Sequence, residues 1–282
     1  MNIRLSGRGL KLKTQHVQIP VGARKMPALV LRSQRPRPDA PGVLWIHGGG
    51  YLTGMKEMVF MSRAVDLVVR FGAVVVSPEY RLSWQAPYPA APHDCYAALL
   101  WMRNHTTELG VNPVQLMVGG ESAGGGLTAA LCLLARDCGQ VNVSYQMPLY
   151  PMIDNLDTAS SANNHNKIWN TQRNHLAWKL YLREDVKSSQ VSPYAAAARA
   201  TNLAGLPPAY TFVCTDEPFY AETLAFVEAL RSAGVSADVD VYQGLYHAFD
   251  ILEPSLPESQ LARERFCEHF ARACETCFAL QP

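Results

Sequence analysis

The sequence lacks several features that would assign it to a particular class of protein. None of its apolar runs approaches the length needed to cross a membrane. Its 25 basic and 24 acidic residues leave a net charge of +1, which gives no electrostatic case for binding nucleic acid or a membrane surface. The first 13 residues are basic but contain no apolar core, so a signal peptide is not expected. We therefore expect a cytoplasmic protein without nucleic-acid or membrane partners.

The chain also lacks a cysteine pattern that would indicate disulfides or a metal site. It has seven cysteines, at positions 95, 132, 138, 214, 267, 274 and 277. No pair has zinc-ligand spacing beside histidines, and Cys274-x-x-Cys277 has no matching second pair. Reduced thiols and no metal are expected, in keeping with a cytosolic protein.

The alternation of apolar runs with helical patterns predicts the fold class. Strands are expected at 15–20, 26–31, 42–46, 73–77, 114–118, 144–151, 208–213 and 237–242, and those at 42–46, 73–77 and 114–118 are of the buried type. Helices are expected at 55–71, 93–109, 127–138, 169–182, 219–233 and 257–280. This order favours an α/β fold with a mostly parallel, doubly wound sheet covered by helices on both faces.

The length of 282 residues suits one large α/β domain with a full core. We expect a single domain over 1–282, with a short N-terminal arm at 1–13. Residues 154–205 interrupt the strand–helix rhythm, and an insertion of this kind is typical of a cap or lid. Its helix is expected to turn Trp169, Leu176 and Leu180 to one side. Trp169, Leu176 and Trp178 either line a pocket or form the core of the lid.

Residues 118–126 form the stretch around which the chain is organised. An apolar strand leads into Gly120-Glu121-Ser122-Ala123-Gly124, and a helix pattern follows. A serine on a strand-to-helix elbow needs small residues two positions away on each side, because side chains there would collide. The pentapeptide alone is a weak signal, and a glycine-rich loop that cradles a phosphate is the alternative.

The rest of the chain offers partners for Ser122 in the order expected of a catalytic triad. A serine hydroxyl needs a histidine base, and the histidine needs an acid that fixes its tautomer. In α/β-hydrolases the chain order is serine, acid, histidine. Asp216 or Glu217 follows a strand, and His247 lies in a loop after the last strand.

Acyl transfer also requires N–H donors for the oxyanion that forms on the substrate carbonyl. Gly48, Gly49 and Gly50 follow a buried strand directly, and their bare backbone allows close approach to a substrate. The amide of Ala123, next to Ser122, supplies a further donor. A merely flexible loop is the alternative for the three glycines.

Four motifs together resemble one known family. They are His47-Gly48-Gly49-Gly50, Tyr80-Arg81-Leu82 with Pro89-Ala90-Ala91, Gly120-Glu121-Ser122-Ala123-Gly124-Gly125 and His247-Ala248-Phe249. Over about residues 40–255 the chain is similar to the hormone-sensitive-lipase family of α/β-hydrolases, the bacterial family IV esterases. The resemblance implies an eight-stranded type of sheet, a small helical cap, and a carboxylesterase that uses no cofactor and cleaves short acyl esters, from acetyl to about hexanoyl.

The same resemblance implies roles for individual residues. Ser122 is the nucleophile and His247 the base, while Ala123 and two of Gly48, Gly49 and Gly50 form the oxyanion hole. His47 orients its loop. Glu121 and Tyr80-Arg81 form a second layer of residues that supports the catalytic groups.

The register of the resemblance favours Glu217 as the acid. The family shows Asp followed by Pro or Leu and then an apolar residue, and Pro218-Phe219 places that Asp on Glu217. Glu222 then matches a second acid of the motif. Hydrolases of this fold use either acid. Asp216, the alternative, suits the N-cap of a helix that begins near Pro218.

Other functions stay open from the sequence alone. A lipase for longer acyl chains is one, although no large apolar lid is evident. A non-catalytic ligand-binding protein is another, although such relatives typically lose the histidine. A peptidase is a third, but nothing marks a site for an N-terminal amine. Family members often have a fuller N-terminal cap, so the pockets here are either more open or completed by a second copy in a homodimer.

Overall fold

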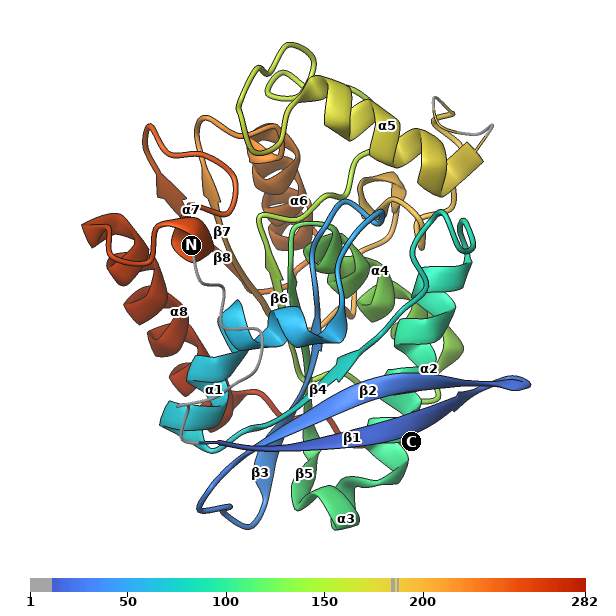
Figure 1. Cartoon of the computed structure of the whole chain (residues 1–282), viewed down its shortest axis with the longest axis vertical. Helices are drawn as coiled ribbons and strands as arrows, with labels where there is room; N and C mark the ends of the chain where they lie inside the picture. The colour runs from blue at the N-terminus through green and yellow to red at the C-terminus, as the bar shows by residue number, and fades with distance from the viewer. Residues whose placement is uncertain (1–11, 184–185, 187) are drawn as a thin grey trace.

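The computed structural model describes residues 12–183, 186 and 188–282, and it is built on one eight-stranded sheet (Figure 1). The strand order is β1-β2-β4-β3-β5-β6-β7-β8. The strands are β1 (Leu12–Val21), β2 (Arg24–Ser33), β3 (Ala40–Ile46), β4 (Val74–Pro78), β5 (Val111–Glu121), β6 (Tyr145–Leu149), β7 (Ala209–Cys214) and β8 (Ala237–Tyr242). The hairpin of β1 and β2 joins β4 antiparallel, and all remaining pairs are parallel. This confirms the predicted α/β class.

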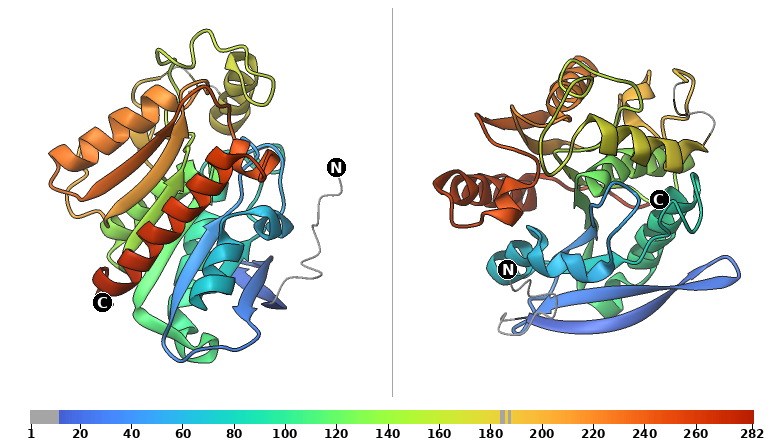
Figure 2. Two further views of the ribbon diagram at one scale, coloured as in Figure 1. Left: turned by 90° about the vertical axis from the view of Figure 1, so that its left-hand side faces the viewer. Right: turned by 45° about the horizontal axis from the view of Figure 1, so that its top comes forward.

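Helices cover both faces of the sheet (Figure 2). They are η1 (Lys56–Met61), α1 (Ala64–Phe71), α2 (Ala90–Asn104), α3 (Thr106–Leu109), α4 (Ala123–Cys138), α5 (Thr171–Leu182), η3 (Ala197–Arg199), α6 (Tyr220–Ser232), α7 (Phe249–Leu252) and α8 (Pro257–Thr276). Side chains of α1 and α8 belong to the core on one face, and those of α2, α4 and α6 to the core on the other. No helix of the described residues is both long and apolar enough to span a bilayer.

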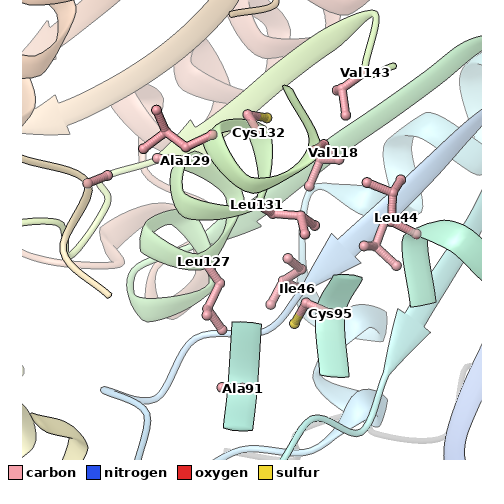
Figure 3. Close-up of a cluster of buried hydrophobic side chains, with 14 of the residues drawn as sticks. Leu44, Ile46, Ala91, Cys95, Val118, Leu127, Ala129, Leu131, Cys132 and Val143 are labelled. Carbon is pink, nitrogen blue, oxygen red and sulfur yellow. The ribbon is translucent and has the colours of Figure 1, made fainter. Parts of the chain in front are cut away.

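The central strands are apolar on both sides because each side faces a helical layer. In β3, Leu44 and Ile46 point to the α4 side and belong to the same core cluster as Leu127 and Leu131, and Figure 3 shows Ile46 next to Leu131. Trp45, between them in the sequence, points to the α8 side and packs edge-on against Phe266 at 5.9 Å. This alternation follows the period of two in a strand.

Two expected helices are divided in the structure. The pattern over 55–71 becomes η1 and α1, because Ser62 between them is extended and its Oγ accepts a hydrogen bond from the amide of Ala64. A serine hydroxyl competes in this way with helix continuation. The pattern over 93–109 becomes α2, which begins earlier, at Ala90, and a separate α3. The loop expected at 244–249 runs directly into the short helix α7.

The insertion at 154–205 contains α5 and η3, and α5 lies over the ends of the parallel strands (Figures 1 and 2). The prediction of which face of this helix is buried is wrong. Leu176 is 52% exposed, and the buried stripe is formed by Asn174, Ala177, Trp178 and Tyr181. That spacing is also helical, so periodicity did not distinguish the two faces. Of the expected arm at 1–13, residues 1–11 lie outside the described residues, and residues 12 and 13 belong to β1.

Candidate active site

Ser122 stands on a sharp elbow between β5 and α4. Its backbone has φ 59° and ψ −120°, which lies outside the regions that most residues adopt. The chain packs tightly on both sides of it. A Cβ at Gly120 would lie 2.7 Å from the carbonyl oxygen of Gly124, and one at Gly124 would lie 2.6 Å from that of His47. Glycine at these two positions therefore allows the elbow to form.

The structure brings Ser122, His247 and Glu217 together in one chain of contacts. Nε2 of His247 lies 2.9 Å from Oγ of Ser122, and Nδ1 contacts Oε2 of Glu217. A carboxylate only accepts hydrogen bonds, so Nδ1 carries the proton and donates it. Nε2 is then left to accept the hydroxyl proton of Ser122. This arrangement can activate the serine as a nucleophile.

Glu217, and not Asp216, is the acidic residue that contacts His247. The side chain of Glu217 is fully buried, and its Oε1 accepts a hydrogen bond of 2.9 Å from the amide of Cys214 at the end of β7. Asp216 is exposed, and its Oδ1 accepts a hydrogen bond from the hydroxyl of Thr215. The capping role considered for Asp216 is wrong, because α6 has Phe219 at its N-cap and no side-chain cap.

Aromatic rings surround His247. The rings of Tyr150 and Phe219 each meet it edge-on at 5.1 Å, and the indole of Trp169 lies 6.4 Å away. Only 4% of His247 is exposed. Aromatic side chains of this kind keep water away from the imidazole and fix its orientation.

Gly48, the first of the three glycines after β3, packs directly against the elbow. A Cβ at Gly48 would lie 2.9 Å from the carbonyl oxygen of Glu121 and 3.2 Å from Cβ of Ser122. Within the described part of the chain, the amides of Gly48, Gly49, Gly50 and Ala123 donate no hydrogen bond to another protein atom. Ala123 is also the first residue of α4, where the helix dipole favours negative charge. These amides can therefore receive an oxyanion that forms beside Ser122.

His47 holds this loop in shape. Its Nδ1 donates a hydrogen bond of 2.8 Å to the carbonyl oxygen of Gly48, and its ring stacks on that of Tyr80 at 4.2 Å. The hydroxyl of Tyr80 donates in turn to the carbonyl oxygen of His47 at 3.0 Å. Burial lowers the pKa of His47, so its ring is neutral at pH 7.

Arg81, next to Tyr80 in the chain, connects this part of the structure to α2. Its amide and guanidinium donate to the buried carboxylate of Asp94 in α2, at 2.9 Å and 2.8 Å. Arg24 of β2 contacts the same carboxylate. The Tyr80-Arg81 pair thus links the glycine loop to α2. The sequence pattern singled out the pair but did not identify Asp94 as its partner.

A buried group of charged side chains lies beneath the site, and sequence reasoning missed most of it. Glu121 accepts hydrogen bonds from Nε1 of Trp45 at 2.8 Å and from the amide of Arg63 at 3.3 Å. Asp250 faces Nε of Arg63 at 3.4 Å and accepts a hydrogen bond from the hydroxyl of Tyr150 at 3.2 Å. Burial, with the charge of Asp250 as a second cause, raises the pKa of Glu121 to about 8. The motif around Ser122 singled out Glu121, but no sequence pattern identified Arg63 or Asp250 as its neighbours.

A cavity of about 240 Å³ opens beside Ser122. It is lined by Met58 and Met61 of η1, by Ile251 and Leu252 of α7, and by Trp169, which lies just before α5. Of the three side chains considered for the pocket, Trp169 lines it, Leu176 faces solvent and Trp178 is buried on the inner side of α5. The described residues contain no group of three or more histidine, cysteine or acidic side chains arranged to hold a metal ion.

Comparison with known proteins relates the whole arrangement to one family. A family model described as an alpha/beta hydrolase fold matches residues 43–251. Esterase LipI of Mycobacterium tuberculosis is 33% identical over 213 residues, which cover 75% of this chain and 66%, slightly under two thirds, of LipI. Carboxylesterase NlhH of the same species is 32% identical over 218 residues, covering 76% of this chain and 67% of NlhH.

Solved structures agree with these sequence matches. A bacterial heroin esterase superimposes with a TM-score of 0.90 at 32% identity, covering 95% of this chain and 87% of its own. An esterase of Pyrobaculum calidifontis superimposes with a TM-score of 0.83 at 30% identity, covering 90% and 83% of the two chains. Each of these four proteins is named as an esterase.

Proposed function

The chain belongs to the α/β-hydrolase family, on its hormone-sensitive-lipase branch, and from that premise we propose that it is a serine carboxylesterase for small esters of short acyl chains, acetyl to about hexanoyl. The observation that carries this proposal is the contact chain from Ser122 through His247 to Glu217. It lies beside a loop of unpaired amides at the mouth of an apolar cavity. Neither a cofactor nor a metal is needed for the reaction.

The proposed reaction is two-step acyl transfer. Oγ of Ser122 attacks the ester carbonyl carbon while Nε2 of His247 takes the hydroxyl proton. The carbonyl oxygen becomes an oxyanion, which accepts hydrogen bonds from the amide of Ala123 and from two of the amides of Gly48, Gly49 and Gly50. Glu217 stabilises the imidazolium. The intermediate then collapses, the carbon–oxygen bond to the alcohol breaks, and His247 returns the proton to the leaving alcohol.

Water completes the cycle. It attacks the acyl group on Ser122, with His247 again taking a proton, and the second intermediate releases the carboxylic acid as Ser122 recovers its proton. All of these groups come from one chain, so the proposed reaction needs no residue of a second copy.

The preference for short acyl chains is supported by the size of the cavity. Its volume of about 240 Å³ is below the roughly 300–1,000 Å³ of sites for drug-sized ligands. We assign residues 154–205 the role of a cap on this cavity, because Trp169 from this segment forms part of its wall. The seven cysteines are free thiols, which supports a reducing, cytoplasmic environment for the enzyme.

The test is hydrolysis of chromogenic esters with acyl chains from two to twelve carbons by the wild type, Ser122→Ala and Ser232→Ala, a surface control in α6. Turnover that peaks at two to six carbons and is lost only in Ser122→Ala supports the proposal. A peak at eight carbons or more favours the lipase alternative. A folded wild type that turns over no ester overturns the proposal and favours a ligand-binding role. A serine-reactive phosphonate should label the wild type at Ser122 and leave Ser122→Ala unmodified.

A further inference from the structure

An ester carries a group on each side of its reacting carbonyl, and the site must hold both. The carbonyl carbon must meet Ser122, and the leaving oxygen must come within reach of Nε2 of His247. The cavity between η1 and α7, walled by Met58 and Leu252, offers room on one side. Trp169, which lies just before α5, lines the same cavity.

Trp169 is the cap residue that limits this space. Its half-buried indole lies so close to the glycine loop that a Cβ at Gly50 would overlap Cη2 and lie 2.9 Å from Cζ2. The same indole is 6.4 Å, ring to ring, from both His247 and Phe219. It therefore bridges the oxyanion loop and the base, the two walls between which the ester must lie.

The indole is held in this position from the cap. Its Nε1 lies 3.4 Å from Oδ1 of Asn174, a residue of α5 that is 2% exposed. Asn170 caps the start of the same helix by accepting a hydrogen bond from the amide of Arg173. A side chain anchored at the fixed first turn of a helix resists displacement by a bulky substrate.

Gly50 makes the close approach of the indole possible. Its φ of 62° and its lack of a Cβ leave the space that the edge of the indole fills. The loop and the cap are thus complementary at one point, beside the reacting carbonyl.

We propose that Trp169 sets the upper size limit for one of the two groups of the ester, the group that points to the cap, while the other group enters the cavity between η1 and α7. This inference rests on the proposed esterase function. It predicts that the enzyme accepts a wide range of sizes for one group of the ester and only small groups for the other.

The experiment uses two ester series and four proteins. One series varies the acyl group with the alcohol fixed, and the other varies the alcohol, from methyl to a branched or cyclic group, with acetate fixed. The proteins are the wild type, Trp169→Ala, Trp169→Phe and Leu176→Ala, the last being a control on the exposed face of α5. The measured quantity is the ratio of kcat/KM for bulky over small members of each series.

Trp169→Ala should raise this ratio about 10-fold or more in one series, since a single methylene in a hydrophobic pocket can discriminate by roughly 10- to 200-fold. In the other series, Trp169→Ala should change the ratio by no more than about threefold. Trp169→Phe should raise the ratio less than Trp169→Ala does, and Leu176→Ala should leave it unchanged. The series that responds identifies the group that faces the cap.

An equal change for all esters in both series, or no change in either ratio, would overturn the inference while leaving the esterase function standing. Failure of the wild type to hydrolyse any ester would overturn both. The thermal unfolding midpoint of each variant shows whether a lost activity reflects a damaged fold.

Discussion

The carboxylate oxygen Oε2 of Glu217 contacts Nδ1 of His247 directly. Glu217→Gln should lower kcat by on the order of 10⁴, as in other triads that lose their acid, because the amide cannot hold the imidazole in the required tautomer or stabilise its charge. Asp216→Asn is the matched control. It should keep a rate near that of the wild type, since the Asp216 side chain is exposed. The measurement is kcat on the best short ester. The opposite ranking of the two variants would transfer the role of the acid to Asp216.

Loss of the hydrogen bond from Tyr80 to the carbonyl of His47 should lower kcat more than it raises KM. Tyr80→Phe removes this hydrogen bond and loosens the glycine loop. We expect kcat to fall roughly 10-fold, less than the roughly 10²- to 10³-fold lost when an oxyanion donor itself is removed. Tyr96→Phe is the control, because that hydroxyl bonds to Gln140 at the surface. A fall in kcat/KM that comes only from a higher KM would contradict the proposed positioning role.

The raised pKa of Glu121 predicts a particular dependence of stability on pH. A carboxyl with a folded-state pKa of about 8, against an ordinary 4.5, binds its proton more tightly in the folded state. Its contribution to stability is therefore present at low pH and is lost as pH rises toward 8. Between pH 6 and pH 8 the free energy of unfolding should fall by about 2 kcal/mol through this group.

The comparison of Glu121→Gln with the wild type isolates this effect. Urea unfolding at pH 6 and pH 8 should show a smaller loss of stability for the variant, because glutamine does not titrate. Glu258→Gln, at an exposed position in the first turn of α8, should keep the wild-type loss. An equal pH dependence in Glu121→Gln and the wild type would show that Glu121 is ionised throughout.

The geometry of the elbow predicts that replacing glycine by alanine lowers stability more at Gly124 than at Gly139. Gly124→Ala places a methyl group against the carbonyl oxygens of Ile46 and His47, so β3 or the elbow must move. We expect a loss of more than about 3 kcal/mol of stability together with loss of activity. Gly139→Ala meets no atom within 4 Å and suffers only from its φ of 64°, which costs about 1–2 kcal/mol. Equal losses of unfolding free energy for both variants would contradict this account of the elbow.

The parts of the site that could be predicted from the sequence are those carried by short contiguous motifs. Ser122, Gly48 to Gly50 and His247 each follow a recognisable strand, and parallel strands bring their carboxyl ends to one edge. The acid was harder to assign, because Asp216 and Glu217 follow the same strand. The path of the backbone decides between them, since it turns Glu217 inward, toward the amide of Cys214, and Asp216 outward.

The contacts beneath the site could not be predicted because they join residues far apart in the chain. Arg63 begins α1 and Asp250 lies in α7, and no local pattern marks them as partners. The prediction of the buried face of α5 failed for a different reason. Both of its faces have helical spacing, and the side that is buried depends on the aromatic rings it meets, such as that of Tyr51, which stacks on Tyr181 at 4.1 Å.

The backbone of Ser122 has a consequence for engineering this chain. Its positive φ costs a residue with a side chain on the order of 1–3 kcal/mol, and glycine would relieve that cost. A screen that selects only for heat resistance would therefore favour Ser122→Gly, and would recover a more stable protein that lacks the proposed nucleophile. Stabilising this fold while keeping its chemistry means leaving position 122 in its unfavourable conformation and seeking the gain elsewhere in the chain.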